Sequence, residues 1–79
     1  MRATVLVRPK QGILDPQGEA VLGSLHHLGF RVDEVRVGRL IDLDLAARDV
    51  PEARAEVERM CEQLLTNPLI ESFQIEVAE

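Results

Sequence analysis

The chain has 79 residues, a formal net charge of −5, a single cysteine and only two aromatic residues, Phe30 and Phe73. So short a chain predicts one domain, residues 1–79, which buries only about 60% of its extended surface and whose aliphatic core is marginal without self-association. The acidic charge and the scarcity of aromatic residues argue against nucleic-acid binding, the lone cysteine excludes an internal disulfide, and no apolar run reaches the roughly 18 residues of a membrane span.

The first predicted element is a β-strand over residues 3–8, where apolar and polar residues alternate, and Pro9 ends it. The chain enters this strand without the architecture of a signal peptide, so we expect a cytoplasmic protein with no membrane partner. Arg8 and Lys10 place two positive charges at the mouth of the loop that follows. They are candidates for contact with an anion or a partner, and a solvated loop flank is the simpler alternative.

The next stretch, residues 12–21, reads G-I-L-D-P-Q-G-E-A-V and marks a helix start. Asp15 is a strong N-cap, and Pro16 suits the first helical position. The Asp15 carboxylate is predicted to accept hydrogen bonds from the N–H groups of Gln17 and Gly18. Because glycine costs about 1 kcal/mol against alanine inside a helix, Gly18 indicates that something approaches the backbone closely there.

Residues 30–45 read as strand. The apolar alternation slips across residues 33–34, which fits a bulge or a bend. We predict two strands here, with Gly38 marking the turn or sharp bend between them; a single long bent strand is the alternative that the sequence leaves open. Asp42 and Asp44 face the same way, and we expect them to form the polar face of an antiparallel sheet rather than a metal site.

A second helix is predicted to begin after Asp49, which can cap it, and to stop at residues 67–68, Asn-Pro. Cys61 lies on the apolar side of this helix and is predicted to be an inert core thiol. The final strand is expected over residues 70–77, where apolar and polar residues again alternate.

The order of elements is βαββαβ. It predicts an α+β fold of the ferredoxin-like kind, a sandwich in which four antiparallel strands form one sheet and both helices cover one face. The other face of this sheet is largely polar, and few residues protect its edge from pairing. We therefore expect a homodimer formed by edge pairing or by packing of the open face.

Three blocks of the sequence resemble the PurS family, the small subunit of bacterial and archaeal phosphoribosylformylglycinamidine synthase. They are residues 12–21, with L-D-P-Q-G as the most specific element, residues 35–43, with V-R-V-G-R, and residues 60–77. The departures from the family pattern are small: Arg39 stands where lysine is common, and Asn67 is followed by Pro68.

The resemblance implies a role in the fourth step of purine synthesis, in which formylglycinamide ribonucleotide becomes the amidine with ATP and glutamine-derived ammonia. It implies that a large synthetase subunit binds ATP and magnesium, and that a glutaminase subunit releases ammonia. The PurS-like subunit then docks the two others and supports ammonia transfer, as a homodimer or tetramer. It is expected to have no catalytic centre, no metal and no cofactor of its own.

On this interpretation the helix start and the Gly38 turn shape a docking surface. The candidate interface residues are Arg8, Lys10, Asp15, Pro16, Gln17, Gly18, Arg36 and Arg39. For each of them a purely structural cap or turn is the alternative. The main rival function is a regulatory domain of the ACT type, whose effectors bind near the first strand-to-helix loop. An acylphosphatase is a weaker rival because that family's glycine-rich pattern is absent.

Overall fold

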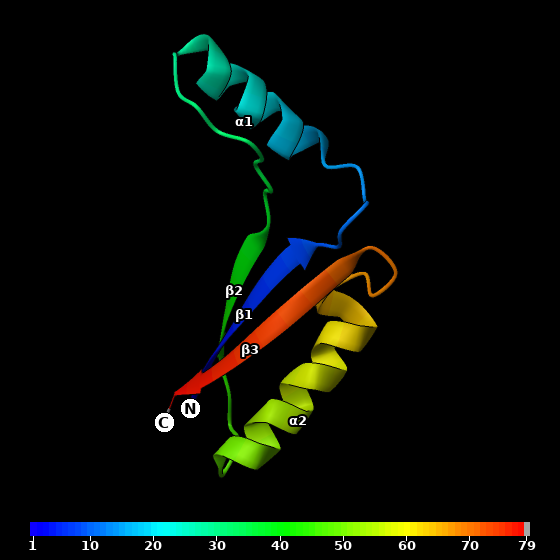
Figure 1. Ribbon diagram of the computed structural model, residues 1–79. Helices are drawn as coiled ribbons and strands as arrows, with labels where there is room; N and C mark the ends of the chain where they lie inside the picture. Colours follow the sequence, from blue (N-terminus) through cyan, green and yellow to red (C-terminus); the bar gives the residue numbers. More distant parts are fainter. Residues whose placement is uncertain (79) are drawn as a thin grey trace.

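The computed structural model describes residues 1–78 (Figure 1). Its strands form one antiparallel sheet in the order β2-β1-β3. The elements in chain order are β1 (Arg2–Pro9), α1 (Pro16–His27), β2 (Arg39–Asp44), α2 (Val50–Met60), the π-helical turn η1 (Cys61–Leu65) and β3 (Glu71–Ala78).

The core lies between this sheet and α2. In the register of the sheet, Val5 of β1 stands opposite Ile41 of β2 on one side and Ile75 of β3 on the other. Side chains of a strand alternate between faces, so these residues share the face that α2 covers. Val5 and Val57 are completely buried there. The alternating patterns predicted for the first and last strands are therefore confirmed.

α2 begins after Asp49 as predicted, but it ends at Met60, and η1 continues the helical backbone only to Leu65, short of the predicted stop at residues 67–68. The Asp49 carboxylate accepts a hydrogen bond from the N–H of Glu52 at 2.8 Å and caps the helix. At the other end, the backbone N–H and the hydroxyl of Thr66 both donate to the carbonyl of Cys61, at 3.1 and 2.8 Å, which closes a π-type turn. The predicted core position of Cys61 is confirmed, since its side chain is fully enclosed, and burial raises the pKa of its thiol.

Two features of the predicted sandwich are wrong for this chain. Within residues 1–78 the sheet has three strands rather than four, and α1 does not lie on the sheet. Instead, residues 12–37 form what we call the arm, in which α1 and a returning segment extend past the end of the sheet (Figure 1). The molecule is accordingly elongated, with extents of 49 × 25 × 14 Å.

The missing strand has a physical reason. Residues 30–37 run back beside α1, and the Nε2 atom of His26 lies 2.7 Å from the carbonyl oxygen of Val32. The N–H of Val37 donates to the Asp15 side chain rather than to a neighbouring strand. The backbone at Gly38 therefore forms neither a hairpin turn nor the middle of one regular strand, and β2 starts only at Arg39.

Candidate partner interface at the neck

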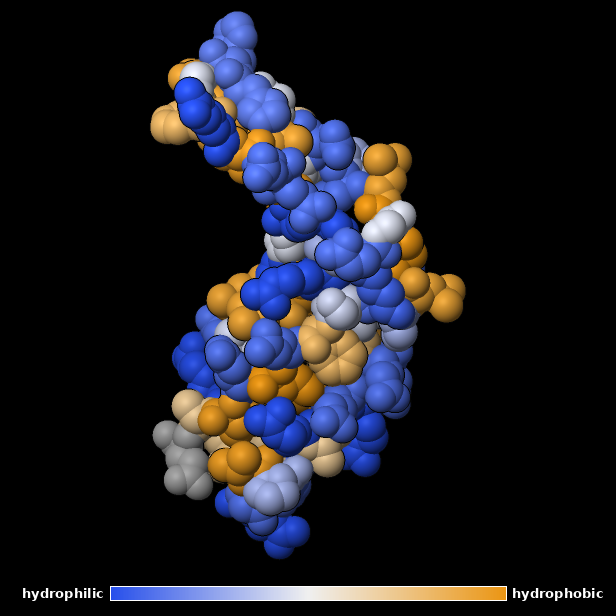
Figure 2. All heavy atoms as spheres, in the orientation of Figure 1, coloured by the Kyte–Doolittle hydropathy of each residue, from blue (hydrophilic) through white to orange (hydrophobic). Residues whose placement is uncertain are grey.

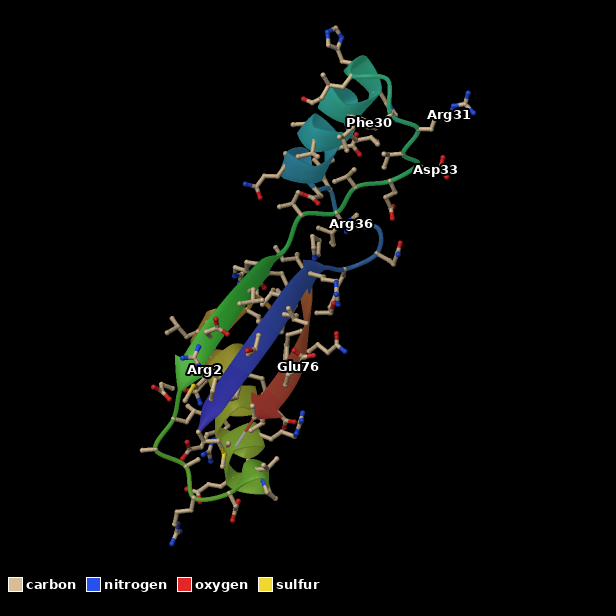
Figure 3. The ribbon with its side chains drawn as sticks, turned by 90° about the vertical axis from the view of Figure 1, so that its left-hand side faces the viewer. Arg2, Phe30, Arg31, Asp33, Arg36 and Glu76 are labelled. Atoms are coloured by element: carbon tan, nitrogen blue, oxygen red, sulfur yellow. The ribbon has the colours of Figure 1, made fainter. Side chains whose placement is uncertain are left out.

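The candidate interface residues converge where the arm joins the sheet. Two segments, residues 10–15 leaving β1 and residues 35–38 returning to β2, lie side by side, and we call this junction the neck. Figure 3 shows Arg36 at this junction, between the sheet and the arm. The guanidinium Nη2 of Arg36 donates to the carbonyl of Lys10 at 2.8 Å and so joins the two segments.

Asp15 binds both the start of α1 and the returning segment. Its Oδ1 accepts a hydrogen bond from the N–H of Gly18 at 3.0 Å, which confirms the predicted N-cap on that residue. Its Oδ2 accepts from the N–H of Val37 at 2.8 Å, a contact that the sequence could not indicate. The side chain of Asp15 is only 11% exposed. Hydrogen bonds from Val37 and Gly18, with the nearby Arg36 charge, hold the pKa of Asp15 below its ordinary value.

Gly12 and Gly18, the two glycines of residues 12–21, are required for different structural reasons. Gly12 has φ +81°, a left-handed conformation that glycine adopts at little cost. Gly18 is buried in the first turn of α1, and a Cβ atom there would collide with the carbonyl oxygen of Val35. The close approach indicated by Gly18 is thus made by the returning segment of the same chain.

Arg36 faces into the neck rather than out to solvent. Its side chain is 23% exposed, and its Nε lies 3.9 Å from Oδ2 of Asp15. Within residues 1–78 this buried Nε has no hydrogen-bond acceptor, since 3.9 Å is too long for a hydrogen bond. Arg36 therefore supports Asp15 by charge and holds Lys10 by a hydrogen bond.

Arg39 is engaged on the other side of the neck. Its guanidinium forms a bidentate pair with the Glu71 carboxylate, at 2.5 and 3.1 Å, and donates to the carbonyl of Leu65 at 2.6 Å. Glu71 also accepts from the N–H of Asn67 at 2.7 Å. This network joins β2, η1 and β3. Glu71 was not among the predicted interface residues, and its only signal in the sequence is its place after the Asn67-Pro68 turn.

The remaining candidates are accessible. Lys10, Pro16 and Gln17 are exposed, and Arg8 is exposed while its Nη1 donates to Gln74 at 3.3 Å. The exposed leucines nearby, Leu14 (78%) and Leu69 (83%), were not among the predicted interface residues, because they lie outside the periodic stretches of the sequence. A hollow of about 360 Å³ opens here; its lining includes Leu14, Pro16, Gln17, Val37 and Ile70.

The carboxylates of the neck predict a specific response to acid. Arg39 and the Asn67 N–H hold the pKa of Glu71 below its ordinary value, as Val37 and Gly18 do for Asp15. A carboxyl group whose pKa is lowered by folding stabilises the folded state at every pH above its ordinary pKa, which is about 3.9 for Asp and 4.3 for Glu. That stability is lost as the pH falls through the folded-state pKa.

We therefore expect Glu71→Gln to be less stable than the unmodified chain at pH 7 and to lose less stability on acidification. Urea unfolding followed between pH 7 and pH 2.5 measures this, because the two stability curves must converge below about pH 4. Glu76→Gln, the same substitution at an exposed position of β3, is the control. Parallel curves for Glu71→Gln and the unmodified chain would contradict the assigned pairing.

Comparisons with known proteins agree on one family. Residues 2–79 match the family model described as PurS: phosphoribosylformylglycinamidine (FGAM) synthase. The chain is 43% identical over 76 residues to the phosphoribosylformylglycinamidine synthase subunit PurS of Archaeoglobus fulgidus, with 95% of each chain covered. The PurS subunit of Bacillus subtilis is 38% identical over 79 residues, covering 99% of this chain and 93% of that protein.

Solved structures show the same fold. The crystal structure of Methanocaldococcus jannaschii PurS matches with a TM-score of 0.87 and 37% identity, over 99% of this chain and 95% of that one. A chain of the PurLQS structure from Thermotoga maritima matches with a TM-score of 0.86 and 29% identity, over 95% and 93%. These findings favour PurS over the ACT-type alternative. The chain therefore belongs to the PurS family, whose members are the PurS subunits of phosphoribosylformylglycinamidine synthase, an enzyme of purine biosynthesis.

Proposed function

We propose that this chain is the coupling subunit of its synthase: it docks the glutaminase subunit to the synthetase subunit and supports ammonia transfer between them in the cytoplasm. ATP and magnesium are then bound by the synthetase subunit, and this chain supplies protein surfaces rather than a catalytic group or a cofactor. One observation carries the proposal: this small chain leaves many large apolar side chains exposed. A relative of the same fold occurs in a PurLQS assembly, where such surfaces can be covered by other subunits.

The uncovered surface lies in two places. α2 packs against β1 and β3 but leaves the same face of β2 less covered. The apolar side chains at and just beyond β2 are only partly buried there: Ile41, Leu43 and Leu45. On the arm, Leu28 is 71% exposed and Phe30 58%. Figure 2 shows hydrophobic residues at the surface of both the arm and the sheet end of the molecule. Apolar surface of this kind on a small chain marks an interaction site.

We assign this surface to a second copy of the chain. The three strands present are those of a ferredoxin-like sheet without the edge strand that residues 30–37 were predicted to form. The arm of a partner copy could supply both missing parts, its residues 30–37 along the free edge of β2 and its α1 across Ile41 and Leu43. The lengths agree, since α1 spans about 18 Å and β2 about 20 Å. Two reciprocal contacts of this kind form a closed homodimer; a tetramer requires a further interface.

The neck then forms the docking surface for the other subunits. The accessible residues in the neck and directly beside it are Arg8, Lys10, Leu14, Pro16 and Gln17. Asp15, Gly18 and Arg36 lie beneath this surface and hold its shape, while Arg39 is exposed on the other side of the neck. Apolar anchors bordered by polar side chains are the usual composition of a protein interface.

Reconstitution tests the proposal. The chain is combined with the synthetase and glutaminase subunits of the same source, and amidine formation is followed with glutamine or with ammonium chloride as the nitrogen donor. We expect glutamine-driven turnover to require this chain, and the three subunits to co-migrate on a sizing column. Equal activity without the chain under both nitrogen sources would refute the assignment.

Lys10→Glu localises the docking surface. We expect this charge reversal to weaken co-migration and glutamine-driven turnover at least 10-fold while the chain stays folded, because a wrong charge at an interface costs several kcal/mol. Arg59→Glu, the same charge change on an exposed position of α2, is the matched control and should retain full coupling. Equal behaviour of the two variants would place the docking surface elsewhere.

A further inference from the structure

The arm is joined to the rest of the chain mainly through the neck. α2 is the helix that packs on β1 and β3, whereas α1 lies beyond the end of the sheet (Figure 1). Phe30, Arg31 and Asp33 all lie far out on the arm, while Arg36 marks the point where the returning segment reaches the sheet (Figure 3). Whatever determines the direction of the arm must therefore act at the neck.

The polar contacts of the neck cross between its two segments in both directions. The Asp15 carboxylate, on the outgoing segment, accepts the N–H of Val37 on the returning one at 2.8 Å. The Arg36 guanidinium, on the returning segment, donates to the carbonyl of Lys10 on the outgoing one at 2.8 Å. The same carboxylate binds Gly18 in the first turn of α1, so the direction of the helix is coupled to both segments.

The backbone at the neck leaves little room for another arrangement. Gly18 lies so close to the carbonyl of Val35 that a Cβ atom could not fit between them. Glycine has no side chain to pack, so the close approach by itself adds little apolar contact. The crossed hydrogen bonds of Asp15 and Arg36 are thus the main directional contacts between the two segments.

We propose that Asp15 and Arg36 form a latch that fixes the direction of the arm relative to the sheet, with Asp15 as a positioning residue. Without the latch, α1 and the sheet keep their own structures but the angle between them varies. The functional reason for a fixed arm direction rests on the homodimer proposed above, because the arm must reach β2 of a partner copy in one geometry. The latch itself is a property of the single chain.

Distances within one chain test this inference. Spin labels are attached at Ser24→Cys on α1 and Glu76→Cys on β3, both exposed positions, and the fully buried Cys61 is not accessible to the reagent. The labelled chain is diluted into an excess of unlabelled chain, so the measured distance is intrachain. In the unmodified neck we expect a single narrow distance distribution.

Asp15→Asn keeps the size of the side chain but replaces one of the two acceptor oxygens with an NH2 group, which cannot accept from the N–H of Gly18 or Val37. We expect a distribution at least twice as broad with an unchanged far-UV circular dichroism spectrum. Asp49→Asn is the matched control, since Asp49 caps α2 in the same manner and binds Glu52 only within its own helix. It should leave the distribution narrow.

Arg36→Gln provides an independent test if Asp15→Asn fails to fold. It removes the bond to Lys10 and leaves the cap on Gly18 in place, and it should also broaden the distribution. A narrow, unshifted distribution in a folded Asp15 or Arg36 variant overturns the latch. The homodimer is tested separately by the mass of the unmodified chain on a sizing column, so a monomeric mass would refute the dimer and leave the latch result valid.

Discussion

Gly38→Ala is expected to destabilise the folded chain by about 3 kcal/mol, in the upper part of the range for forcing extra atoms into a packed site. A Cβ atom at Gly38 would lie inside van der Waals contact of the carbonyl oxygen of Val7, on the central strand of the sheet. Backbone cannot rotate away as a flexible side chain can, so β1 or the neck must move. Chemical denaturation at pH 7 measures the loss.

Gly23→Ala is the matched control for this prediction. Gly23 lies inside α1 with no atom near the position of an added Cβ, and it is exposed. The substitution should stabilise α1 by up to about 1 kcal/mol, because alanine is the better helix former. Opposite signs for the two Gly→Ala variants are the expected result; a neutral effect of Gly38→Ala would show that the close contact with Val7 relaxes freely.

Leu25→Glu is expected to dissociate the proposed homodimer. Leu25 lies on the apolar stripe of α1 with Val21 and Leu28, and none of these residues belongs to the core of its own chain. Burying an unpaired carboxylate against a partner sheet is costly. We expect the dissociation constant to rise at least 100-fold, equivalent to about 2.7 kcal/mol. Sedimentation over a range of concentrations measures it.

Ala20→Glu adds the same charge to the same helix on an exposed position away from this stripe. It should leave the dimer intact and the helix content unchanged. If Leu25→Glu sediments as a dimer like Ala20→Glu, the second copy does not dock through the arm. A loss of glutamine-driven turnover in Leu25→Glu but not in Ala20→Glu would further link dimer formation to coupling.

Features that depend on neighbours in the sequence could be predicted well. Residue type and local spacing are enough to predict three features: the helix caps at Asp15 and Asp49, the alternation in the first and last strands, and the buried position of Cys61. The arm could not be predicted in this way. Residues 30–37 carry the alternation of a strand, and periodicity does not reveal whether the matching edge belongs to the same chain. The order of elements along the chain is ferredoxin-like whether residues 30–37 pair with their own sheet or with that of another chain.

The same distinction applies to the candidate site. The sequence placed Asp15 and Gly18 together because they are three residues apart. It could not show that Val37 and Arg36 meet them, or that Glu71 pairs with Arg39, since these contacts join segments far apart in the chain. The L-D-P-Q-G and V-R-V-G-R blocks, noted separately as elements of a resemblance, are in fact the two halves of one junction. The neck explains why they occur together.

The central position of β1 affects how the chain must fold. β1 is synthesised first, yet its partners β2 and β3 are both made later, with the arm inserted before β2. Closing such loops costs entropy before any sheet contact forms, and non-local pairings of this kind slow folding. Even after β2 has paired with β1, the other edge of β1 remains open and aggregation-prone until β3 is complete. Truncations within Glu71–Ala78 should therefore yield insoluble chains rather than smaller folded ones.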